Sequence, residues 1–75
     1  MTNHPNRSRS FDALAAMVRA EQANIDSHMQ TAARYDAEAD AGLIQHHVAL
    51  ALAAARRQEA HRAEIGRRFP ARVGV

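Results

Sequence analysis

The chain has 75 residues, a net charge of +2 and no cysteine. A chain of this length forms at most one small domain, and neither a disulfide nor a thiolate metal site can reinforce it. The hydrophobic fraction of 47% includes 18 alanines, so few large side chains are available for a core, and oligomerisation is the remaining way to stabilise such a scaffold.

The ten basic residues are all arginine, which together with the high alanine content suggests a GC-rich, bacterial coding genome. No run of about 18 apolar residues is present, and the N-terminus lacks the apolar segment of a secretory signal. We therefore expect a cytoplasmic protein that does not span or bind a membrane.

Residues 1–9 have the polar composition of a flexible basic tail, with Pro5, Arg7 and Arg9 and no apolar period. Ser10 is the expected N-cap of the first helix, because its hydroxyl can accept from an early backbone N–H. Asp12 would place a negative charge at the positive end of the helix dipole.

The first helix is predicted over residues 10–39. Its apolar residues recur in steps of three, four and seven, which places them on one helical face: Phe11, Leu14, Val18, Ile25, Met29 and Ala32. Helix propensity is weak between Asn24 and Thr31, and Ser27 followed by Gln30 fits a capping box. A three-helix arrangement with a break near Asp26 is therefore the alternative architecture.

Gly42 is the expected stop for the first helix, which puts the turn at residues 40–42, with Asp40 as a possible cap for the next helix. The second helix is predicted over residues 43–69 and ends before Pro70, leaving 70–75 as a second flexible tail. Its face toward the first helix would hold four residues: Ile44, Ala51, Ala55 and Phe69. Neither helix sustains a heptad of apolar residues beyond two turns.

Two helices joined by a short turn pack antiparallel, so residues 10–69 should form an all-α helical hairpin. The predicted turn sets a register in which Glu21 lies near Arg62 and Asp26 lies near Arg57. Opposite charges then face each other across the two helices, which would favour this register more than it would stabilise the fold.

Several side chains of the second helix fall outside the predicted contact face. Leu43, Leu50 and Ala54 lie to one side of it and Leu52 to the other, with His47 also on a flank. Leaving a leucine in water forgoes roughly 1.5 to 3 kcal/mol. We therefore expect this surface to be an interface, either between two hairpins that dimerise into a four-helix bundle or with a helix of another protein.

Charge is unevenly distributed along the chain. Residues 11–55 carry two arginines against six acids, whereas residues 56–75 carry six arginines against two glutamates. A hairpin would gather arginines at its open end, where they could bind phosphate groups of a nucleic acid. The candidate residues for this alternative are Arg7, Arg9, Arg62, Arg67, Arg68 and Arg72.

The sequence shows no pattern typical of catalysis or of a bound cofactor. No cysteine or glycine-rich phosphate loop is present, and two helices form no large concave pocket. The histidines do not have the i, i+4 spacing of a helical metal site: His46 and His47 are adjacent, and His61 lies about 21 Å beyond His47 along one helix. We therefore expect no metal, no cofactor and no enzymatic activity, and a small interaction protein such as an adaptor, chaperone-like subunit or regulator.

Overall fold

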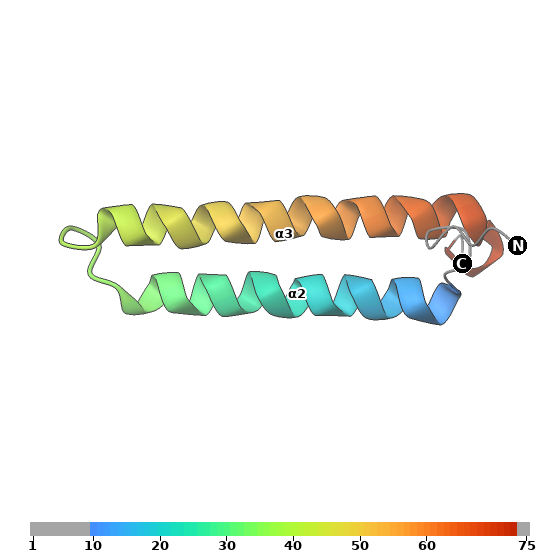
Figure 1. Ribbon diagram of the computed structural model, residues 1–75, viewed down its shortest axis with the longest axis horizontal. Coiled ribbons are helices and arrows are strands. Elements are labelled where there is room, and N and C mark those ends of the chain that lie inside the picture. The colour runs from blue at the N-terminus through green and yellow to red at the C-terminus, as the bar shows by residue number, and fades with distance from the viewer. Residues whose placement is uncertain (1–9, 74–75) are drawn as a thin grey trace, which may run out of the picture.

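The computed structural model describes residues 10–73, and the side chains of residues 10–71. Two long helices, α2 (Phe11–Arg34) and α3 (Ala41–Arg68), are followed by a single helical turn, α4 (Pro70–Val73). α2 and α3 lie side by side and antiparallel, with the connecting turn at one end of the molecule and α4 at the other (Figure 1). This all-α hairpin confirms the predicted fold.

The start of α2 follows from its capping chemistry. The Ser10 hydroxyl accepts a hydrogen bond from the Ala13 backbone N–H at 3.1 Å, and Asp12 lies in the first turn, where a negative charge complements the helix dipole. The helix then runs without interruption to Arg34, so the alternative architecture with a break near Asp26 is wrong.

Polar side chains in the middle of α2 bond along the helix and do not break it. The Gln22 amide donates to Asp26 at 3.0 Å, and the Asn24 amide donates to Glu21 at 3.0 Å. The Thr31 hydroxyl donates to the Ser27 carbonyl at 2.9 Å. These contacts have the i, i+3 and i, i+4 spacing of a helix surface, so the groups that could compete with the helical backbone are already bonded in the helical state.

The turn comes earlier in the chain than residues 40–42. Its backbone closes at Asp36 and Asp40: the Asp36 N–H donates to the Asp40 side chain at 3.1 Å, and the Asp40 N–H donates to the Asp36 carbonyl at 3.0 Å. Asp40 occupies the N-cap position of α3, but its carboxylate bonds to Asp36 and gives no side-chain cap to that helix. Gly42 is not a helix stop, because it lies in the first turn of α3 with ordinary negative φ.

The C-terminal end of the hairpin turns at Phe69, whose N–H donates to the Ile65 carbonyl at 2.7 Å. Pro70 then occupies the first position of α4, where its missing N–H costs no helical hydrogen bond. Residues 70–73 are therefore helical and were wrongly predicted as part of a flexible tail. The predicted tail at residues 1–9 lies outside the described residues, as do residues 74–75.

The surface along which the two helices meet, here called the seam, repeats every three and four residues. In α2 every seam residue is buried or half-buried: Phe11, Leu14, Val18, Glu21, Ile25, His28 and Ala32, continued by Tyr35. The same holds in α3 for Ile44, His47, Ala51, Ala54, Gln58, His61, Ile65 and Arg68. This is the spacing of a coiled coil, and it becomes visible only when the polar residues are counted with the apolar ones.

Candidate functional site

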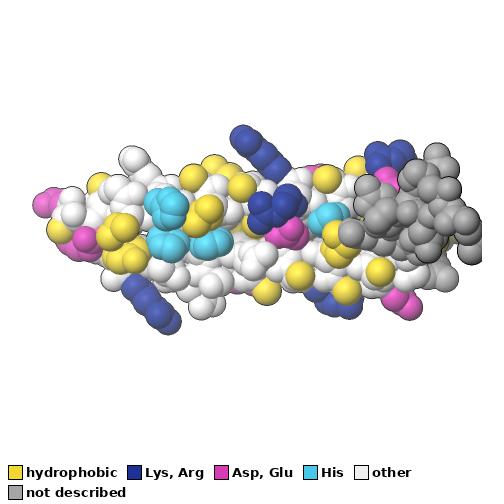
Figure 2. Space-filling view, in the orientation of Figure 1, with side chains coloured by type: hydrophobic (Ala, Val, Ile, Leu, Met, Phe, Trp, Pro, Cys, Tyr) yellow, Lys and Arg dark blue, Asp and Glu magenta, His cyan; other side chains and the backbone are white. Residues whose placement is uncertain are grey.

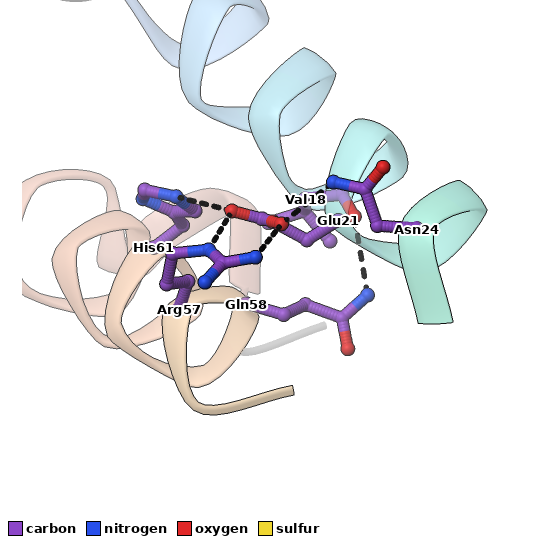
Figure 3. Close-up of polar contacts among 6 residues, drawn as sticks. All are labelled: Val18, Glu21, Asn24, Arg57, Gln58 and His61. Atoms are coloured by element: carbon purple, nitrogen blue, oxygen red, sulfur yellow. Dashed lines mark hydrogen bonds and ion pairs between the residues drawn. The ribbon is translucent and has the colours of Figure 1, made fainter. Parts of the chain in front are cut away.

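Polar contacts across the middle of the seam centre on Glu21 (Figure 3). The Arg57 guanidinium donates from Nε to one carboxylate oxygen of Glu21 at 2.7 Å and from Nη2 to the other at 3.1 Å. The His61 Nε2 lies 3.9 Å from the same carboxylate. Glu21 is thus held by a two-point contact from the opposite helix, which fixes orientation as well as charge.

The predicted charge pairing was wrong by five positions along α3, about 1.4 helical turns. Glu21 contacts Arg57 and not Arg62, whose guanidinium lies 3.7 Å from Glu59 of its own helix. Asp26 bonds to Gln22 along α2 and not to Arg57. The error follows from the turn, because a first helix that ends at Arg34 shifts every opposed pair toward the start of α3.

The same contacts set the ionisation of the pair. The hydrogen bond from Arg57 is the largest cause that lowers the pKa of Glu21, followed by the hydrogen bond from Asn24. The Glu21 carboxylate in turn raises the pKa of Arg57. Both groups are therefore charged at neutral pH.

Gln58 is a polar residue inside the seam, with only 6% of its surface exposed. Its amide nitrogen donates to the Val18 carbonyl at 3.1 Å and to the Gln22 side chain at 3.0 Å. A buried polar residue at a coiled-coil position costs stability but favours the one register in which it is bonded. Gln58 and Glu21 together specify how α2 and α3 align.

Three histidines gather beside the turn-proximal part of the seam, on the face seen in Figure 2. The Nδ1 atoms of His28 and His47 are 3.2 Å apart across the two helices. The Tyr35 ring stacks on His47 with a centroid separation of 5.8 Å, and His46 meets His47 edge-on at 5.4 Å. His47, predicted as an interface residue, thus lies half-buried in contacts within the hairpin.

The other predicted interface residues divide into two groups. Ala54 is fully buried, with 0% of its surface exposed, because it faces α2 directly; its assignment to a free surface was wrong. Leu43 and Leu52 remain 47% and 57% exposed, and Leu50 is half-buried. Met29 is also 47% exposed, although its spacing predicted a place on the face of α2 that packs against α3.

Leu43 and Leu52 emerge on opposite flanks of the hairpin. They are separated by nine positions, which is a rotation of about 180° around a helix of 3.6 residues per turn. Each flank of α3 therefore carries an exposed leucine that α2 does not cover.

Three of the arginines proposed to bind a nucleic acid are paired within α3. Arg67 and Arg68 both contact Glu64, Arg68 at 4.0 Å, and Arg62 contacts Glu59. The Arg68 guanidinium also lies over the Phe69 ring, 5.3 Å from its centroid. Nearby glutamates thus offset part of this positive charge. Arg7, Arg9 and the side chain of Arg72 lie outside the described residues, and nucleic-acid contact stays a prediction.

Residues 10–71 contain no group of three or more histidine and acidic side chains that could together hold a metal ion. No helix within the described chain is long and apolar enough to cross a bilayer. Comparison with family models, with curated protein sequences and with solved structures finds no match to this chain.

Proposed function

We propose that the protein is a small non-enzymatic interaction protein that acts through the apolar side chains left outside the hairpin, first of all by pairing with a second copy in a four-helix bundle. The observation that carries the proposal is the half-exposed state of three large aliphatic side chains on rigid helices: Met29, Leu43 and Leu52.

The hairpin's own core is thin. Among residues 10–71 the buried apolar side chains are Leu14, Ile65 and three alanines, and no large side chain is completely enclosed. A domain of this size has little stability to spare, and one seam lined by alanine contributes little apolar burial. A second copy that covers one of these flanks would contribute about 1 kcal/mol or more for each exposed aliphatic side chain that it removes from water.

A four-helix bundle is the assembly that this shape favours. Two antiparallel hairpins can stack face to face, and each then supplies the apolar neighbour that the other lacks. Because the contact would be made by the same surface on both copies, it closes after two subunits and does not propagate.

Light scattering coupled to size-exclusion chromatography tests the proposal at micromolar concentration. We expect a dimer for the wild type and a shift toward monomer for Leu43→Glu or Leu52→Glu, whichever lies on the flank in contact. Ala60→Glu is the matched control, because Ala60 is exposed on α3 eight residues beyond Leu52, about 12 Å along the helix, and should leave the dimer intact.

A monomeric wild type would refute pairing with a second copy and would favour a helix of another protein as the partner. A dimer that neither leucine variant weakens would show that the assembly uses another surface.

A further inference from the structure

Two histidines from different helices meet across the seam. His28 belongs to α2 and His47 to α3, and both occupy seam positions. We propose that His28 and His47 together bind a divalent transition metal ion of the kind that prefers imidazole, such as Zn²⁺, through their Nδ1 atoms.

The distance between the two nitrogens matches a shared ion. Zn²⁺ binds histidine nitrogen at about 2.0–2.1 Å, so two ligands at a tetrahedral angle are about 3.3–3.4 Å apart and two at a right angle about 2.9 Å apart. The Nδ1 atoms of His28 and His47 are 3.2 Å apart, between these limits. An ion can therefore replace the shared hydrogen between the rings with little movement of either helix.

Neighbouring rings hold His47 in this orientation. Tyr35 lies nearly parallel to the His47 ring, with an interplanar angle of 26°, while His46 meets it at 74°. Ligands fixed by their surroundings bind a metal better than ligands that must be ordered on binding. His28 and His47 are each half-buried, which leaves the pair open to solvent for entry of the ion and for water ligands.

The charge around the pair also suits a cation. No arginine or lysine occurs between Arg34 and Arg56, and the turn in this interval carries Asp36, Glu38 and Asp40. The side chains that contact the two rings, Tyr35 and His46, bear no permanent positive charge. A cation bound here would therefore meet no permanent positive charge on the side chains that contact the two rings.

Two protein ligands leave the remaining coordination positions to water. No third histidine or acidic group within residues 10–71 completes the site, so it differs from a closed structural zinc site with four protein ligands. Because its ligands come from both helices, the ion would cross-link α2 to α3 beside the turn.

Isothermal titration of the tag-free protein with ZnCl₂ at pH 7.5 tests the proposal. We expect saturable binding of one Zn²⁺ per chain, weakened at least tenfold in His28→Gln and in His47→Gln. His61→Gln, together with His4→Gln outside the described residues, is the matched control and should change the affinity less than threefold. Far-UV circular dichroism checks that each variant keeps its helix content.

The wild type supplies a second readout that does not depend on the folding of variants. In long-range ¹H–¹⁵N spectra of the imidazoles, Zn²⁺ should shift the Nδ1 resonances of two histidines and leave the others in place. Absence of saturable binding, equal effects of all four substitutions, or shifts spread over every histidine would each overturn the proposal.

Discussion

The two ends of the hairpin are built differently. At the open end large apolar side chains close the seam: Phe11 meets Phe69 edge to face with a centroid separation of 5.6 Å, and Leu14 and Ile65 are buried beside them. Toward the turn the buried residues are small, Ala32, Ala51 and Ala54, and histidine and tyrosine rings share the seam with the half-buried Ile25 and Ile44.

Three large aliphatic residues of the turn-proximal half lie outside the seam. Met29, Leu43 and Leu52 are exposed in the same half of the hairpin in which the buried side chains are smallest. At the open end the large apolar side chains are thus covered within the chain, whereas in the turn-proximal half three of them are exposed to solvent. We infer that the open end stabilises the single chain and that the turn-proximal half makes contact with a partner.

The largest effect should come from the open end. Leu14→Ala truncates a side chain that is only 3% exposed, so the free energy of unfolding should fall by about 2–5 kcal/mol. Urea denaturation followed by circular dichroism measures the loss. Gln30→Ala, at an exposed site of the same helix, should change it by less than about 0.5 kcal/mol. A loss below about 1 kcal/mol for Leu14→Ala would contradict the assignment of the core to this end.

A smaller loss of stability should follow from a larger side chain at Ala54, the most deeply buried residue of the seam. Ala54 faces α2 with no exposed surface, so Ala54→Leu forces the helices apart and should cost about 1–3 kcal/mol. The exposed Ala49 provides the control, because Ala49→Leu on the same helix meets no neighbour in α2. Equal stability of the two variants in urea would mean that α2 and α3 do not approach closely at Ala54.

Gln58 lies in the seam between the two halves of the hairpin. Replacing it tests whether its buried amide sets the helix register or the stability of the fold. Gln58→Leu removes a bonded polar group from a buried seam position, so unfolding in urea should need as much free energy as in the wild type, or up to about 1 kcal/mol more. Interhelical side-chain NOEs in NMR spectra should show additional register states. A loss of more than about 1 kcal/mol would show that the Gln58 hydrogen bonds themselves stabilise the hairpin.

The smallest effect concerns pH. The Arg57 hydrogen bond lowers the pKa of Glu21 in the folded chain below its ordinary value of 4.5. The resulting stabilisation is therefore present above pH 4.5 and is lost as the pH falls through the lowered folded value. Glu21→Gln should unfold more easily at pH 7 and lose less stability between pH 5 and pH 3 than the wild type does.

The control for that titration is Glu59→Gln, because Glu59 contacts only an exposed arginine of its own helix, at 3.7 Å. It should leave the slope of stability against pH nearly unchanged. Identical slopes for the wild type and Glu21→Gln would show that the Glu21–Arg57 pair does not contribute to the alignment of the helices.

The sequence predicted the helical hairpin because helix propensity, the Ser10 cap and the helical spacing of apolar residues agree with one another. The predicted turn is misplaced because Gly42 is a typical helix stop. The observed turn is closed instead by hydrogen bonds between Asp36 and Asp40, and no single residue type predicts such a turn. The register error for Glu21 followed from that one displacement.

The polar seam was missed for a different reason. The spacing of apolar residues alone predicts a contact face through Ala51 and Ala55, and it does not reveal the heptad steps through His47, Gln58 and His61. Including every residue at alternating steps of three and four from Phe11 and from Ile44 would have placed His28 and His47 on facing positions. Their 3.2 Å approach still depends on side-chain rotamers that the sequence pattern does not specify.

The most direct test of the central claim, that the turn-proximal half needs a second copy to cover it, is the concentration dependence of thermal unfolding. Association with the folded state raises the unfolding temperature by mass action, so Tm followed by circular dichroism should rise steadily as the protein concentration increases from 1 to 100 μM, roughly two decades. The rise should be reduced in Leu43→Glu or Leu52→Glu and retained in Ala60→Glu. A wild-type Tm that is the same across this range would contradict the account.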